Sequence, residues 1–169
     1  MATSGSRDFT LDVSDIIEEA YERCGLEVRT GYDARTARRS MNLMFADWAN
    51  RGVNLWTVRQ STVTLTQGQA TETLGQDVVD LLEVVIRRTG TDFNITKVSR
   101  GDYLSVPSKT TQGRPSQYYF NRQIDPQITL WPTPENSTDQ LVYYYVRRIE
   151  DADASVNDVE LPFRFLPCA

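Results

Sequence analysis

Histidine is absent from this 169-residue chain, and cysteine is scarce. Without histidine, Ser-His-Asp catalysis, Cys-His catalysis and histidine-ligated metal sites are all excluded. The two cysteines, Cys24 and Cys168, lie near opposite ends. We expect both to be reduced, buried and packed as small apolar residues, although the sequence leaves a disulfide open.

Long hydrophobic runs are also missing. No apolar stretch reaches the roughly 20 residues that a membrane span needs. The first ten residues, MATSGSRDFT, lack the apolar core of a signal peptide. We therefore expect no membrane partner, and a protein that is made in the cytosol and stays there until it joins a larger assembly.

Lysine is nearly absent, since only Lys97 and Lys109 are lysines among the 18 basic residues. The acidic residues outnumber the basic ones and give a formal net charge of −5 and a pI near 4.8. A free-standing domain that reads a DNA sequence is usually basic, so that class is disfavoured. The bias to arginine is typical of protein interfaces, although a lineage bias in codon use explains it equally well.

Two amphipathic helices are predicted in the first third of the chain. The first runs from about Ser14 to Cys24 and ends at Gly25, and the second runs from about Asp33, as N-cap, to Asn50 and ends near Gly52. Their apolar residues recur at spacings of three and four, so each helix carries one apolar stripe. The stripes consist of Val13, Ile16, Ile17, Ala20, Tyr21 and Cys24, and of Ala37, Met41, Met44, Phe45 and Trp48.

The middle of the chain is predicted to be rich in β-strands. Residues 61–66 and 69–74 alternate around Gln67-Gly68, which predicts a hairpin. Further strands are expected at 84–86, 93–98, 118–120, 127–131 and 141–146, with a short helix opened by Ser99 and Asp102. The fold class is therefore α+β, with long amphipathic helices packed with an antiparallel β-sheet or a small β-sandwich.

The domain organisation follows from these elements. We expect a flexible N-terminal arm at 1–9 and a single α+β domain at 10–148. Its helical part covers about 11–52 and its β-rich part about 54–148. An acidic linker and an apolar C-terminal segment occupy 149–169.

Three motifs invite a functional interpretation, and each has a stronger structural one. Asp77, Asp80 and Glu83 recur at helical spacing, which we interpret as a solvated edge rather than a catalytic or metal-binding cluster. The tripeptide 100–102, Arg-Gly-Asp, is interpreted as a helix start rather than an adhesion motif. The aromatic runs 118–120 and 143–145 are interpreted as β-core with tyrosine rims rather than as a base-stacking surface. No catalytic, cofactor-binding or metal-binding residue is assigned.

Charge is distributed unevenly along the chain. Residues 29–59 hold six arginines against Asp33 and Asp47, whereas 149–160 hold five acidic residues and no basic one. Opposite charges at separate places suit a head-to-tail contact between copies, although both segments can equally be solvated faces. The residues expected at such a subunit interface are Arg35, Arg38, Arg39, Asp151 and Asp153.

Five segments carry a resemblance to a known family. They are 36–60, then Leu-Gly-Gln-Asp-Val-Val-Asp-Leu-Leu-Glu at 74–83, Ser-Arg-Gly-Asp-Tyr-Leu at 99–104, Thr-Thr-Gln-Gly-Arg-Pro at 110–115 and Leu-Trp-Pro-Thr-Pro at 130–134. In this order they resemble the head-to-tail adaptor proteins of short-tailed bacteriophages, known as tail tubular protein A or head-completion proteins. The resemblance covers roughly residues 10–166.

The resemblance implies a virion structural protein without enzyme activity or cofactor. Such a protein forms a homo-oligomeric ring of about twelve copies at the head-tail junction, and is assembled in the host cytoplasm. The ring would bind the portal protein, a tail nozzle similar to tail tubular protein B and tail fibres. It would extend the channel through which double-stranded DNA passes without sequence-specific binding, and help retain the packaged genome.

The resemblance also places the portal contact at the C-terminal end of the chain. The residues expected there are Leu161, Pro162, Phe163, Phe165 and Leu166. Two alternatives stay open at this point. One is another neck or tail-completion ring protein, and the other is a cell-wall hydrolase carried in the tail.

Overall fold

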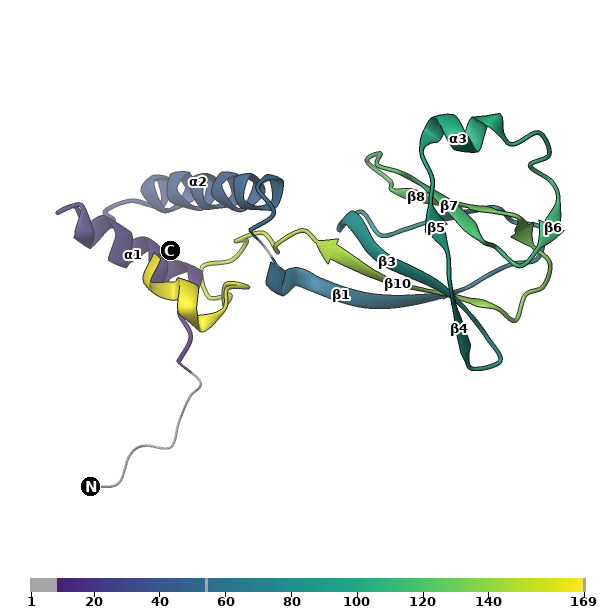
Figure 1. The fold of residues 1–169 in the computed structure, drawn as a ribbon. Helices are drawn as coiled ribbons and strands as arrows, with labels where there is room; N and C mark the ends of the chain where they lie inside the picture. The colour runs from purple at the N-terminus through teal and green to yellow at the C-terminus, as the bar shows by residue number, and fades with distance from the viewer. Residues whose placement is uncertain (1–8, 54, 169) are drawn as a thin grey trace, which may run out of the picture. The chain divides into compact units, whose positions relative to one another are not determined.

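The computed structural model describes residues 9–53 and 55–168, with side chains as far as 165 (Figure 1). Helices and antiparallel-rich sheets occur together, which confirms the predicted α+β class. The chain divides into two compact units. One takes the chain up to Trp56 and again from Ile149 onward, and the other is Thr57–Arg148. The predicted arm at 1–9 lies outside the described residues except for Phe9.

The first unit, here the helical unit, contains α1 (Val13–Arg23), α2 (Gly31–Asn50) and the 3-10 helix η2 (Phe163–Cys168). Another short 3-10 helix, η1 (Leu55–Thr57), ends where the second unit begins. Helix α1 starts after Asp12, whose carboxylate accepts a hydrogen bond from the Asp15 backbone N–H at 2.9 Å. It stops as predicted at Gly25, because the φ of +71° there favours glycine.

Helix α2 starts two residues before the predicted position. Its N-cap is Thr30, so the prediction of Asp33 as N-cap was wrong. The two residues form a capping box, in which the Asp33 N–H donates to the Thr30 hydroxyl at 3.3 Å and the Asp33 carboxylate accepts from the Thr30 N–H at 3.1 Å. An acidic residue at the third helical position completes such a box from inside the helix.

The core of the helical unit confirms most of the two predicted stripes. Its buried residues are Val13, Ile16, Ile17, Met41, Phe45, Ile149 and Ala152, with Tyr21, Ala37, Met44, Trp48 and Trp56 among the partly buried residues packed on them. Ala20 and Cys24 are exposed instead. The expectation of a buried Cys24 was therefore wrong, because the residue follows the last turn of α1, where the stripe leaves the core. The Cys168 side chain lies outside the described residues.

The second unit, here the β unit, is built from two four-stranded sheets and one two-stranded sheet. The first sheet is antiparallel throughout and has the order β1 (Val58–Thr64), β10 (Gln140–Arg147), β3 (Val78–Arg88) and β4 (Thr91–Asn94). The second has the order β2 (Thr71–Thr73), β8 (Gln127–Trp131), β7 (Gln117–Asn121) and β5 (Thr96–Lys97), of which only β5 and β7 run parallel. Strand β6 (Gln112–Gly113) pairs with β9 (Thr133–Pro134).

One hydrophobic core joins the two larger sheets. Leu81, Val84 and Ile86 of β3 pack in the same cluster as Tyr118 and Phe120 of β7, and Leu141 and Tyr143 of β10 belong to it too. Tyr144 is exposed, and Tyr119 and Tyr145 are partly exposed. The interpretation of both aromatic runs as β-core with tyrosine rims is confirmed, since alternate strand residues face opposite sides.

One local prediction in the β unit was wrong, and one spacing pattern had a different structural basis. Residues 61–66 and 69–74 form no hairpin, because β1 pairs with β10 and β2 pairs with β8 in the other sheet. The turn at Gly68 moves the chain between sheets. Helical spacing at 77, 80 and 83 was also misleading, since 78–88 is one long strand. The Arg-Gly-Asp segment does start a helix, α3 (Arg100–Ser105), through the Ser99–Asp102 capping box.

Candidate interaction surfaces

Several surface and charge features of this structure are suited to contacts with a partner. In the described part of the chain, no group of three or more His, Cys, Asp or Glu side chains is arranged to hold a metal ion. None of the helices that the structure describes is both long and apolar enough to cross a membrane. These features are the C-terminal segment, the outer faces of α1 and α2, and the charged groups of the β unit.

The C-terminal segment, 149–165, folds back onto α1 and α2 and completes their core. Ile149 is 1% exposed and Ala152 is 7% exposed. The Asn42 amide of α2 binds both backbone groups of Ala152, accepting from its N–H at 2.8 Å and donating to its carbonyl at 3.4 Å. The Val13 N–H donates to the Asn157 carbonyl at 3.0 Å. The segment predicted as a linker thus shares its hydrogen bonds with both helices.

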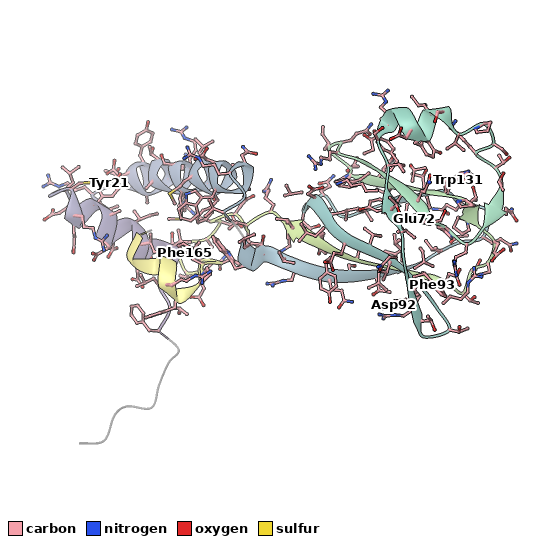
Figure 2. All side chains as sticks on the ribbon, viewed as in Figure 1. Tyr21, Glu72, Asp92, Phe93, Trp131 and Phe165 are labelled. Carbon is pink, nitrogen blue, oxygen red and sulfur yellow. The ribbon has the colours of Figure 1, made fainter. Side chains whose placement is uncertain are left out.

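The end of this segment carries the residues expected to contact the portal, and they differ in accessibility. Phe165 lies 5.0 Å from the Trp56 ring, centroid to centroid, and the Trp56 indole N–H donates to the Glu160 carbonyl at 3.0 Å (Figure 2). Leu161 packs against the helical core. Phe163, by contrast, is 69% exposed. Pro162 is half-buried, and the Leu166 side chain lies outside the described residues.

The residues expected at a subunit interface also differ in their surroundings. Arg38 is half-buried, and its guanidinium donates to the backbone carbonyl of Asp153 in the same chain. Arg35 and Arg39 are exposed, as are Asp151 and Asp153. The structure therefore brings Arg38 and Asp153 together within one copy. A contact of these residues between copies stays a prediction.

The outer face of α1 is acidic and hollowed. A depression of about 650 Å³ is lined by Phe9, Leu11, Asp15, Glu18, Glu19, Glu22, Arg23 and Phe163. The sequence-based predictions assigned no surface to these carboxylates. Their spacing of three and four residues, opposite the apolar stripe, was the signal that could have identified a continuous acidic face. The hollow itself depends on Phe9 and Phe163, whose rings meet edge to face 6.5 Å apart.

The outer face of α2 has the opposite charge. Tyr32, Arg35, Arg39 and Leu43 recur at spacings of three and four, and all are exposed. Tyr32 is 72% exposed and Leu43 is 67% exposed. Large apolar and arginine side chains on one exposed face are typical of protein contacts.

The β unit buries one charged pair. Asp139 is 1% exposed and accepts hydrogen bonds from the Arg88 guanidinium, the shortest at 2.6 Å. Arg88 also pairs with Glu135 at 2.8 Å. Hydrogen bonds to Asp139 and Glu135 raise the pKa of Arg88 above its ordinary value. The pair fixes the connection between β9 and β10, where the Asp139 carbonyl also accepts from the Leu65 N–H at 2.9 Å.

A second charged cluster links the two larger sheets. Asp80 of β3 accepts from Arg122 at 2.6 Å and from Lys97 of β5 at 3.2 Å. Burial opposes ionisation of Asp80, but these hydrogen bonds outweigh it and lower its pKa. Asp80 was predicted to lie on a solvated edge, whereas the structure makes it a cross-sheet partner. Glu72 behaves differently, since burial raises its pKa and its Oε1 has no hydrogen-bond partner among the described residues (Figure 2).

Comparison with the models of known protein families gives a match. The model of the family described as SU10 adaptor protein matches residues 11–169, which include both units and the C-terminal segment. None of the curated proteins matches the chain. The finer resemblance, to the tail tubular protein A family of short-tailed phages, stays a prediction.

Proposed function

We propose that this chain, which belongs to the SU10 adaptor protein family, joins the portal vertex of a phage head to the tail as one subunit of a ring. The family is one of phage adaptors, so a structural role in the virion follows from membership alone. The match over 11–169 is the observation that carries the proposal. Attachment to the portal, ring closure and retention of the genome are the parts that we add.

The helical unit supports a ring because it presents two outer faces of opposite charge. A contact between unlike faces repeats from copy to copy, and it closes into a ring when the rotation between neighbours allows. A portal presents many identical sites at once, so weak individual contacts become strong together. We propose about twelve copies, matching a twelvefold portal vertex.

We propose that the C-terminal segment contacts the portal protein. Among the residues expected at this contact whose side chains are described, Phe163 is the exposed one, whereas Leu161 and Phe165 already pack within their own unit. The two inward-facing residues would hold the segment in place, and Phe163 would supply the apolar contact.

The remaining partners follow from a place at the head-tail junction. The opposite end of the ring would receive a tail nozzle protein and tail fibres. Double-stranded DNA would pass through the lumen without sequence-specific binding. A net charge of −5 is compatible with that passage, because a lumen poor in positive charge does not hold phosphates. Assembly in the host cytoplasm fits the same scheme.

The test is imaging of the purified chain with and without the portal protein of the same phage. We expect rings seated on one end of the portal, and fewer rings as the salt concentration rises, because exposed charges are screened. Rings that ignore the portal would instead indicate a neck or tail-completion protein. A monomer that neither binds the portal nor forms rings would refute the proposal, and clearing of purified cell walls would indicate a hydrolase.

A further inference from the structure

The acidic face of α1 points away from the core that α1 shares with α2. Asp15, Glu18, Glu19 and Glu22 lie within a narrow sector of the helix, opposite Val13, Ile17 and Tyr21. Glu19 is paired with Arg23 at 2.8 Å. Glu18 and Glu22 are exposed and have no recorded ion pair within the described part of the chain.

The basic face of α2 also points away from that core. Arg35, Arg39 and Leu43 lie opposite Met41 and Phe45, which are buried. The nearest acidic side chains are already engaged within the helix, because Asp33 belongs to the capping box and Asp47, one turn beyond Leu43, pairs with Arg51 at 2.8 Å. Among the described residues, Arg35 and Arg39 have no recorded partner.

We propose that the α2 face of one copy binds the hollowed α1 face of the next copy, and that this contact builds the ring. Arg35 and Arg39 would pair with Glu18 and Glu22, while Tyr32 and Leu43 would fill the part of the hollow lined by Phe9 and Leu11, which leaves Phe163 to the portal. The occupant is therefore a second copy of this chain. The inference rests on the proposed function, since it names the surface that closes the ring.

Spacing supports this match. Arg35 and Arg39 are one helical turn apart, about 6 Å along the axis, and so are Glu18 and Glu22. One helix-to-helix alignment can therefore bring both pairs together. The contact is heterologous, because the two faces differ, and it leaves a free α1 face and a free α2 face until the ring closes. A small residue at Ala46, on the same face of α2, allows the neighbouring helix to approach.

The complementary charges also argue against a contact between like faces. Two acidic α1 faces would repel each other, and so would two α2 faces, because each carries two arginines. The hollow of about 650 Å³ is large enough to receive ring and leucine side chains. Apolar residues within a charged rim are typical of specific protein contacts.

Charge reversal tests the proposal on the full chain. We expect Arg35→Glu/Arg39→Glu to raise the protein concentration for half-maximal self-assembly at least about tenfold, because like charges then face each other. Glu18→Arg/Glu22→Arg should do the same. Combining all four substitutions should restore assembly to within about threefold of wild type. The control is Arg100→Glu, an exposed arginine on α3 in the β unit, which should leave assembly unchanged.

Cross-linking between copies identifies the contact directly. In a Cys24→Ser/Cys168→Ser background, a Leu43→Cys copy mixed with a Glu22→Cys copy should form a cross-linked dimer with a short bis-maleimide. Neither variant alone should do so above the level seen with Arg100→Cys. The proposal would be overturned if the variant with all four charge substitutions did not recover self-assembly and the mixed cross-linked dimer did not form.

Two outcomes separate this inference from the proposed function. If wild-type rings assemble on the portal and the charge-reversal variants assemble equally well, the adaptor function stands and the α1–α2 contact is wrong. If Phe163→Ala and Glu18→Arg/Glu22→Arg weaken portal binding and leave self-assembly unchanged, the hollow belongs to the portal, and the proposed occupant is refuted. A variant at the alternative acidic site, Asp153→Arg, should leave self-assembly unchanged.

Discussion

The Asn42 side chain binds the backbone of Ala152 through both its oxygen and its nitrogen, at 2.8 and 3.4 Å. More than a hundred residues of chain separate the two partners, so the contact ties the C-terminal segment to α2. Because Ala152 is buried, its N–H and carbonyl would otherwise be left without hydrogen bonds away from water. The relationship explains how a polar, acidic segment can lie across a helical core.

Removal of that amide should weaken the helical unit. We expect Asn42→Ala to lower the free energy of unfolding by about 1–3 kcal/mol, since it leaves a buried backbone N–H unpaired. Denaturant unfolding followed by tryptophan fluorescence measures the change, because Trp48 and Trp56 both lie in this unit. The matched control is Asn50→Ala, at the exposed end of α2, which should change stability by less than about 0.5 kcal/mol. Equal midpoints for the two variants would contradict the expectation.

Two phenylalanines two positions apart should respond differently to truncation. Phe165→Ala removes a ring that packs at a tilt against Trp56, and should destabilise the helical unit by about 1–2 kcal/mol. Phe163→Ala removes a ring that is 69% exposed, and should cost less than about 0.5 kcal/mol. Thermal unfolding compares the two, and the emission of Trp56 should shift to longer wavelength only in the first. A larger loss at Phe163 would show that the assignment of inward and outward rings is wrong.

Neighbouring arginines on β3 provide a comparison of buried and exposed ion pairs. Asp139→Ala leaves Arg88 without its buried partner, and should cost about 2–4 kcal/mol. Asp92→Ala breaks the exposed pair with Arg87 at the β3–β4 hairpin, and should cost less than about 1 kcal/mol. Denaturant unfolding of the β unit within the full chain measures both. Similar losses would mean that burial of Asp139 does not govern the energy of its pair.

Acid should weaken the β unit partly through Asp80. Its pKa is lower in the folded protein than in the unfolded chain, so its stabilising contribution is present above the unfolded value of about 3.9 and is lost as the pH falls through the folded value. We expect Asp80→Asn to be less stable than wild type at neutral pH, and the gap to close on acidification. Unfolding midpoints measured between about pH 2 and pH 7 provide the test. A gap that stays constant with pH would contradict it.

Glu72 is a control for the same titration, because its pKa is shifted in the opposite direction to that of Asp80. Burial raises its pKa, so ionised Glu72 opposes folding above the folded value, and that opposition disappears below the unfolded value. Glu72→Gln should therefore stabilise the β unit at neutral pH and lose its advantage in acid. A loss of stability at neutral pH would indicate that the carboxylate has a favourable partner.

Local patterns predicted the elements that depend on neighbours in sequence. The helices at Val13–Arg23 and Gly31–Asn50 follow from apolar spacing, because side chains three and four residues apart share a face of a helix. The Ser99–Asp102 capping box was read correctly for the same reason, since every contact in it spans three residues. The sequence also determined the charges of the segments, and the absence of histidine chemistry.

Only the tertiary structure decided which distant groups meet. Strand β1 pairs with β10, about eighty residues away, and no turn residue at Gly68 encodes that choice. Arg38 meets the Asp153 carbonyl within one chain, and Asp80 meets Arg122 across two sheets, because in each case the two segments share a buried core. The spacing of side chains along the sequence determines which face of a helix or strand a residue occupies. The partner of that face depends on long-range packing, which no short segment of the sequence determines alone.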